Sequence, residues 1–135
     1  THYLSFLGYL IKHYADKTCT APKTQRELSA VEKAKAYLHD NFQNDITLEE
    51  LASSVGLNRA YLIRAFKKTT GLPPHAYLTQ LRLSEAKRQL IKGVALSQVA
   101  LNTGFADQSH FSRTFKHTYG ITPAVYAKAT FIRES

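Results

Sequence analysis

Polar side chains with the chemistry to recognise nucleic-acid bases gather on one face of residues 108–116. Helical spacing places Phe111 and Phe115 on the opposite, apolar face. The polar face carries Gln108, Ser109, Ser112, Arg113 and Lys116. Glutamine can pair through two hydrogen bonds with adenine, and arginine can do the same with guanine. Taken one at a time, these residues suit an ordinary helix surface equally well, so only a recurrence of the whole pattern would indicate a shared role.

The same two-faced pattern does recur in residues 60–67. Leu62, Ala65 and Phe66 follow the spacing of a buried helix face. The other side carries Ala60, Ile63, Arg64 and Lys67. An isoleucine in this position could contact a thymine methyl group, and Arg64 could bind guanine or a phosphate. Because both faces recur together, a shared role in binding DNA explains them better than chance.

The sequence offers little for catalysis or metal binding. Its six histidines form no pair three or four residues apart, and Cys19 is the only cysteine, so a zinc site is not expected. The acidic residues are scattered, without the paired carboxylates of an acid–base site, and no glycine-rich phosphate loop is present. We therefore expect no catalytic residue, no metal and no cofactor.

The charge balance favours an anionic partner. Lysine and arginine number 18 against 10 aspartate and glutamate residues, which gives a formal net charge of +8. Nucleic acid is the partner that best suits this excess, an anionic membrane surface comes second, and a basic surface without any partner is the remaining interpretation. No stretch approaches the ~20 apolar residues of a membrane span. We expect Lys67, Lys68 and Lys116 to contact phosphates.

The two polar faces belong to an internal repeat. Residues 46–52 align with residues 94–100 at an offset of 48, and residues 62–77 align with residues 111–126 at an offset of 49. The matched positions include glycines, a proline and aromatic residues, among them Gly56 and Gly104, Gly71 and Gly120, Pro74 and Pro123, and Tyr77 and Tyr126. A tandem module of two copies explains these matches better than coincidence.

Each copy predicts a helix, a tight turn and a second helix. In the first copy, Thr47 and Glu50 form a capping box that starts the first helix. Gly56 can adopt the positive φ of a turn, and Asn58 can cap the next helix, which Gly71 can end. The second copy repeats the turn at Gly104 and the helix end at Gly120, although Ala95 replaces the capping threonine and weakens the start. We therefore expect two helix-turn-helix units.

The whole chain is predicted to be all-α, because no stretch alternates apolar and polar residues as a strand does. The expected order is a helix at 1–17, a linker at 18–28, a folded body at 29–128 and a tail at 129–135. Ser29 and Glu32 form a capping box that should start the body. Within the body we expect the first helix-turn-helix at about 47–70, a linker helix at 74–92 and the second helix-turn-helix at about 95–119.

Residues 1–17 form a separate amphipathic segment, in which Tyr3, Leu7, Leu10 and Tyr14 recur at helical spacing. We expect this helix to belong to a preceding domain. The alternatives are that it packs onto the main body or pairs with a second copy of itself.

The second copy carries a run of residues that resembles the signature of the AraC/XylS family of transcription regulators. Gly104-Phe105 is followed by Ser109-x-Phe111-x-Arg113-x-Phe115-Lys116 and then by Gly120-x-Thr122-Pro123. The similarity extends over residues 31–128. It implies the family's C-terminal DNA-binding domain, homeodomain-like and all-α with about seven helices. Such a domain would bind as a monomer and place two recognition helices in successive major grooves of bent DNA.

Carried over position by position, the resemblance implies base contacts from Arg59, Ala60, Ile63 and Arg64 in the first copy, and from Gln108, Ser109, Ser112 and Arg113 in the second. Ala60 and Ile63 depart from the larger polar or aromatic residues often found there. The implied partners are double-stranded DNA, at an asymmetric site with elements about one helical turn apart, and RNA polymerase, with no membrane. The full-length protein would be a bacterial, cytoplasmic, nucleoid-associated activator whose preceding domain allows dimerisation.

Two other functions remain open from the sequence. A helical protein-interaction module could use the apolar stripe of residues 1–17. Some relatives of the family fuse this module to a DNA-repair domain with reactive cysteines, but Cys19 lacks neighbours that would clearly activate its thiol. We therefore expect a sequence-specific DNA-binding transcription regulator without enzymatic activity.

Overall fold

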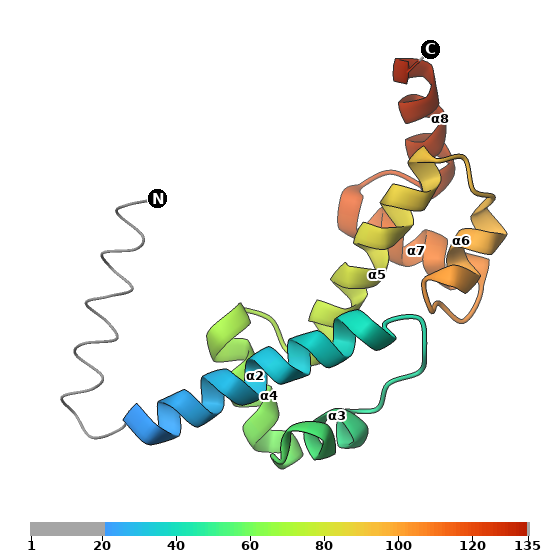
Figure 1. Ribbon diagram of the computed structural model, residues 1–135. Helices are drawn as coiled ribbons and strands as arrows, with labels where there is room; N and C mark the ends of the chain where they lie inside the picture. Colours follow the sequence, from blue (N-terminus) through green and yellow to red (C-terminus); the bar gives the residue numbers. More distant parts are fainter. Residues whose placement is uncertain (1–20, 135) are drawn as a thin grey trace, which may run out of the picture.

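A computed structural model describes residues 21–134 of the chain, and Figure 1 shows their arrangement. The predicted helix at 1–17 and Cys19 lie outside the described residues. Within the described range the chain forms seven α-helices and no strand, so the all-α prediction is confirmed. The helices are α2 (Ala21–Asn41), α3 (Leu48–Val55), α4 (Arg59–Thr70), α5 (Pro74–Ile91), α6 (Leu96–Asn102), α7 (Gln108–Tyr119) and α8 (Pro123–Glu134).

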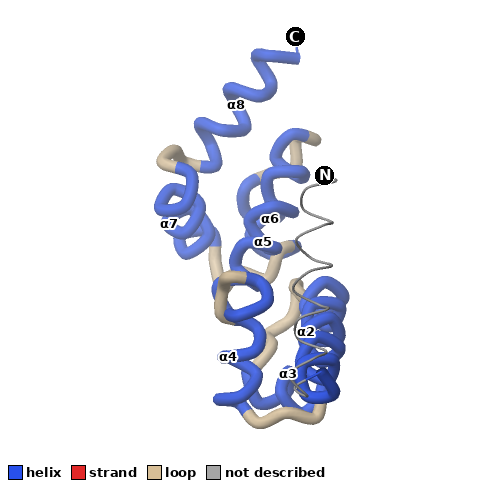
Figure 2. Tube along the Cα trace, turned by 90° about the vertical axis from the view of Figure 1, so that its left-hand side faces the viewer, coloured by secondary structure: helices blue, strands red, loops and turns tan. Residues whose placement is uncertain are grey.

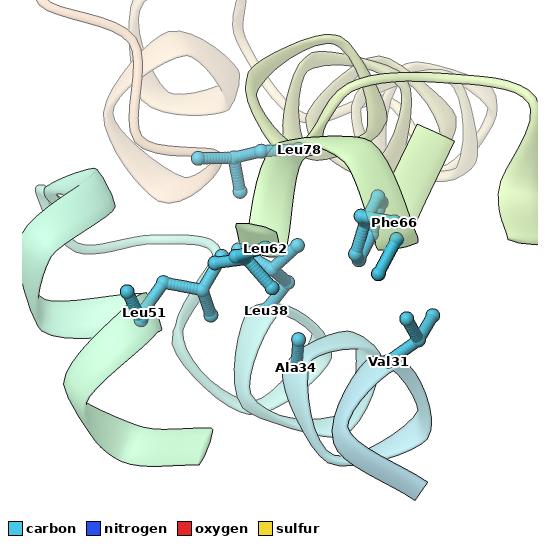
Figure 3. Close-up of a cluster of buried hydrophobic side chains, with 9 residues drawn as sticks. Val31, Ala34, Leu38, Leu51, Leu62, Phe66 and Leu78 are labelled. Carbon is cyan, nitrogen blue, oxygen red and sulfur yellow. The ribbon is translucent and has the colours of Figure 1, made fainter. Parts of the chain in front are cut away.

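Two hydrophobic clusters divide the described residues into two lobes. The first lobe contains α2, α3 and α4, and its core consists of Val31, Ala34, Leu38, Leu51, Ala52, Leu62, Ala65, Phe66 and Leu78. Figure 3 shows Leu51, Leu62 and Leu78 converging on this core from three different helices. The second lobe contains α6, α7 and α8, and its core consists of Leu83, Ala86, Leu90, Val99, Ala100, Phe105, Phe111 and Phe115.

Helix α5 belongs to both lobes. It contributes Leu78 to the first core, and Leu83 and Leu90 to the second. Helical spacing in the sequence predicts one apolar side for this helix, made of Tyr77, Leu78, Leu81, Ala86 and Leu90. This side omits the fully buried Leu83 and includes Tyr77 and Leu81, which are only partly buried. A helix that packs against two lobes buries apolar side chains on two of its faces, so a single apolar stripe cannot describe it.

The repeat in the sequence is also a repeat of contacts. Phe66 of α4 meets Tyr77 of α5 edge to face, with ring centroids 5.2 Å apart. Phe115 of α7 meets Tyr126 of α8 with ring centroids 5.6 Å apart. Such pairs contribute about 0.5–1.5 kcal/mol beyond the burial of the rings. Helix α5 therefore follows α4 in the same way as α8 follows α7.

The start of the folded body differs from the prediction. Residues 21–28 are helical, so the predicted linker at 18–28 is wrong from residue 21 onward, and Ser29 lies inside α2 instead of capping it. Pro22 is compatible with helix because it stands in the first turn, where backbone N–H groups have no partner within the helix. The Tyr61 hydroxyl donates a hydrogen bond to the Glu27 carboxylate and so ties this part of α2 to α4.

The other end also differs from the prediction. Helix α8 continues to Glu134, so the tail predicted at 129–135 is wrong for residues 129–134. After Pro123 this stretch contains neither glycine nor proline, and nothing in the sequence stops the helix at residue 128. The end of the family resemblance at residue 128 therefore does not mark the end of the helix.

The two lobes meet where α5 passes the end of α2. Arg82 of α5 donates hydrogen bonds from Nε to the carbonyl oxygen of Phe42 at 2.8 Å and from Nη2 to that of Asn44 at 2.9 Å. Gly104, in the turn between α6 and α7, has a φ of +87°, and a Cβ there would stand 2.6 Å from the Phe42 carbonyl oxygen. Its repeat partner Gly56 has a φ of +73°, but a Cβ there would meet nothing within 4 Å.

We predict that Gly104→Ala destabilises the protein more than Gly56→Ala. Both changes place a side chain in the left-handed conformation, which costs about 1–2 kcal/mol. Only Gly104→Ala also presses a methyl group against a backbone carbonyl, which should add about 1–3 kcal/mol. Urea unfolding of the two variants measures the difference in the free energy of unfolding. Equal values for the two variants would contradict the close contact at Gly104.

Candidate nucleic-acid interface

The helices that carry the two predicted polar faces, α4 and α7, begin and end in the same way. The Asn58 side chain accepts a hydrogen bond from the Tyr61 backbone N–H at 2.8 Å, and Asp107 does the same for His110 at 2.7 Å. Each helix is 12 residues long and is followed by a glycine with positive φ. Matching caps therefore give the two helices the same length and the same register along the repeat.

Both helices bury their predicted inner faces. Leu62 and Phe66 of α4, and Phe111 and Phe115 of α7, are all 0% exposed. The predicted contact residues lie on the outer faces: Arg59, Ala60, Arg64, Lys67, Lys68, Gln108, Ser109, Arg113 and Lys116 are exposed, and Ile63 and Ser112 are half-buried. The structure thus gathers each predicted set on the outer side of its helix.

The outer faces carry positive charge without compensating acids on the same helix. Neither α4 nor α7 contains aspartate or glutamate, whereas their last turns carry Lys67, Lys68 and Lys116. Such a surface attracts the phosphate backbone of a nucleic acid. Figure 2 places α4 and α7 on the same side of the molecule, one in each lobe.

Arg59 has a protein partner that sequence reasoning missed. Its Nη1 lies 3.0 Å from Oε1 of Glu49 in α3, and the two side chains are 61% and 63% exposed. An exposed pair of this kind contributes about 0–1 kcal/mol, so an anion or a base edge can displace Glu49 at little cost. The sequence gives no signal for the pair because the two residues belong to different helices.

Ile63 is half-buried. It lines an apolar hollow together with Leu48 of α3 and, at the start of α5, Pro73 and Pro74. The predicted contact between Ile63 and a thymine methyl group requires an exposed side chain. The half-buried side chain packs against protein on one side and leaves only part of its surface for another molecule.

Tyr61 connects the start of α2 to the outer face of α4. Its hydrogen bond to Glu27, followed by burial and the negative charge of Glu27, raises the pKa of the Tyr61 hydroxyl. The guanidinium carbon of Arg64 lies 6.0 Å from the centre of the Tyr61 ring, at the outer limit of a cation–π contact. The contact of Glu27 could not be predicted from the sequence, in which this residue falls within the expected linker.

Other kinds of site find little support in the part of the chain that the structure describes. Residues 21–134 contain no group of three histidine, cysteine, aspartate or glutamate side chains arranged to hold a metal ion. None of the described helices is both long enough and apolar enough to cross a membrane.

Comparison with known proteins agrees with this geometry. A family model described as a helix-turn-helix domain matches residues 51–129, more than half of the chain. The uncharacterised HTH-type transcriptional regulator YbfI of Bacillus subtilis is 34% identical over 110 residues, covering 80% of this chain and 39% of that protein. The raffinose operon transcriptional regulatory protein RafR of Pediococcus pentosaceus is 30% identical over 128 residues, covering 94% and 45%. The chain spans less than half the length of these two relatives.

Solved structures share the arrangement of the helices. The C-terminal domain of AraT, a response regulator from Geobacillus stearothermophilus, has a TM-score of 0.71 at 28% identity over 74% of this chain and 84% of that one. An AraC-type transcriptional regulator from Chromobacterium violaceum has a TM-score of 0.71 at 28% identity over 76% and 93%. The DNA-binding domain of AdpA, solved with a target DNA, has a TM-score of 0.73 at 25% identity over 76% and 94%. The chain therefore belongs to the AraC/XylS family of helix-turn-helix transcription regulators and contains the DNA-binding domain of that family.

Proposed function

We propose that α4 and α7 enter successive major grooves on one face of a DNA duplex, and that one copy of the domain recognises an asymmetric site. The observation that supports this most is the matched pair of helices, equal in length and capping, with acid-free outer faces on one side. A helix fits the major groove, and grooves that face the same way recur about every 10 base pairs. Because the outer residues of α4 and α7 differ, the two elements of the site should differ in sequence.

The outer residues divide into two roles under this proposal. Base contacts come from Arg59, Ala60, Ile63, Arg64, Gln108, Ser109, Ser112 and Arg113. Phosphate contacts come from Lys67, Lys68 and Lys116. Contacts to bases carry the sequence preference, whereas contacts to phosphates position the protein and add affinity on any DNA.

The names of the relatives support a regulatory role for the whole protein. RafR is named as a regulator of the raffinose operon, and the AdpA domain was solved on its target DNA. By extension, we propose an activator that works in the bacterial cytoplasm, at the nucleoid, and contacts RNA polymerase. The domain binds as a monomer, while effector sensing and any dimerisation belong to another domain of the full-length protein.

We predict that DNA binding weakens steeply as salt is added. Each phosphate contact lowers the logarithm of the affinity by about 0.9 per tenfold rise in salt, so the three lysines alone give a slope of about −2.7. Fluorescence anisotropy with a labelled duplex between about 50 and 200 mM salt measures this slope. An affinity that does not change over this range would contradict an electrostatic interface.

We predict that Arg113→Ala reduces specificity, whereas Lys116→Ala weakens binding to all DNA. Loss of a base-contacting arginine should lower the discrimination between a selected target and random DNA by about 1–3 kcal/mol. Lys116 is the matched control because it lies one turn later on α7, is also exposed and carries the same charge. If Arg113→Ala weakened binding to the target and to random DNA equally, Arg113 would be a phosphate contact instead.

We predict that inserting five base pairs between the two elements reduces binding to the level of a single element. Half a helical turn rotates the second groove away from the side that faces the protein, about 10 base pairs being one turn. Titration of the original and the lengthened duplexes, both derived from a site selected from random DNA, tests this. Unchanged affinity on the lengthened duplex would show that the two units do not bind together.

A further inference from the structure

We propose that Arg82 is the positioning residue that sets the angle between α4 and α7, and thereby restricts the domain to one spacing of DNA elements. This inference rests on the two-groove binding proposed above. Arg82 lies in the middle of α5, between Leu78 of the first core and Leu83 of the second. Its guanidinium donates hydrogen bonds to the carbonyl oxygens of Phe42 at 2.8 Å and Asn44 at 2.9 Å.

These two carbonyls belong to the segment that follows α2. The last carbonyl groups of a helix have no partner within it, and a cation at that end interacts favourably with the helix dipole. A planar guanidinium presents several N–H donors in a fixed geometry, so one arginine can bind both carbonyls at once. Arg82 therefore attaches α5 to the first lobe at the point where the chain turns from α2 toward α3.

The surroundings of Arg82 make this attachment tight. The side chain is half-buried, and burial lowers its pKa while the charge of Asp45 opposes this change. A partly desolvated cation depends on its hydrogen-bond partners more than an exposed one does. Partial burial and two hydrogen bonds together hold the guanidinium against residues 42–44.

Gly104 of the second lobe packs closely against the same guanidinium. A Cβ on Gly104 would stand 2.9 Å from Nε of Arg82 as well as 2.6 Å from the carbonyl oxygen of Phe42. Gly104 stands three residues before Asp107, which caps α7. A shift at this junction therefore moves the start of α7 relative to the first lobe, which holds α4.

Comparison of the two copies shows that the contacts between the lobes are not needed for the packing inside one unit. The core residues Val31, Ala34 and Leu38 of α2 match Leu83, Ala86 and Leu90 of α5 at an offset of 52, so Arg82 aligns with Ala30. Gly104 aligns at the offset of 48 with the unobstructed Gly56. The first copy folds without an arginine or a crowded glycine at these positions. Arg82 and the close contact at Gly104 therefore act in holding the two lobes together.

The test compares three variants of the 135-residue chain. Arg82→Met removes both hydrogen bonds but keeps an unbranched side chain, and Arg82→Lys keeps the charge without the planar fork of donors. Arg88→Met is the matched control, because Arg88 lies on the same helix, carries the same charge and bonds Glu85 of its own helix with Nε–Oε2 at 2.9 Å. The probes are a duplex with both elements selected from random DNA, a duplex with one element, and the duplex with five inserted base pairs.

We expect Arg82→Met to bind the single-element duplex as the original protein does. Its affinity for the two-element duplex should fall roughly tenfold, because the second unit is no longer held in the binding orientation. For the same reason, the five inserted base pairs should weaken binding by Arg82→Met less than they weaken binding by the original protein. Arg82→Lys should have a two-element affinity between those of the original protein and Arg82→Met. Arg88→Met should keep the original ratio of two-element to single-element affinity.

A second measurement needs no DNA. Residual dipolar couplings should fit one common orientation for both lobes in the original protein, and two independent orientations in Arg82→Met. A common orientation in Arg82→Met, or an unchanged preference for the two-element duplex, overturns the role of Arg82. The same holds if Arg82→Met and Arg82→Lys lose single-element and two-element affinity equally, because that is the effect of a general folding defect.

The failure of the proposed function is visible without any variant. If the original protein binds the single-element and two-element duplexes equally well, the two-groove mode is wrong, and the inference about spacing fails with it. If the original protein prefers the two-element duplex and Arg82→Met does so equally, the binding mode stands and only the role of Arg82 is wrong.

Discussion

Both hydrophobic cores depend on α5. Leu78 is 4% exposed in the first core, and Leu83 and Leu90 are 1% and 3% exposed in the second. Burying a leucine contributes about 1.5–3 kcal/mol, which is a large share of the roughly 5–15 kcal/mol that stabilises a whole domain. Neither lobe can release α5 without losing much of its stability. The two outer helices are therefore connected through one continuous helix that is packed into both cores.

The inner and outer faces of α4 and α7 have separate tasks. Phe66 and Phe115 fix the helices through their aromatic contacts with Tyr77 and Tyr126, so most residues of the outer faces take no part in the core. An outer face that does not support the fold can change its residues without loss of stability. This is the physical basis on which one fold can recognise many DNA sequences.

Local signals predicted most of the helices, and tertiary contacts account for what was missed. Asn58 and Asp107 cap α4 and α7 as their residue types predict, because a cap needs only neighbours along the chain. The early start of α2 involves a hydrogen bond between Glu27 and Tyr61, and the burial of Leu83 depends on a second lobe. Helical spacing likewise predicted the outer faces, but it could not predict the pairing of Arg59 with Glu49 across two helices, nor the bonds of Arg82.

The two outer faces are not equivalent in what they offer DNA under the proposed binding mode. In α4, Ala60 offers only a methyl group, Ile63 is half-buried beside Pro73, and Arg59 must first leave Glu49. The matching positions in α7 carry hydrogen-bonding side chains, namely Ser109, Ser112 and Gln108. Hydrogen bonds to base edges discriminate strongly between sequences, whereas apolar contact and phosphate binding discriminate weakly. Recognition of base sequence should therefore depend more on α7 than on α4, in which only Arg59 and Arg64 of the proposed base contacts can form such hydrogen bonds. Helix α4 is held at its groove by Lys67 and Lys68 and favours DNA whose shape brings that groove within reach.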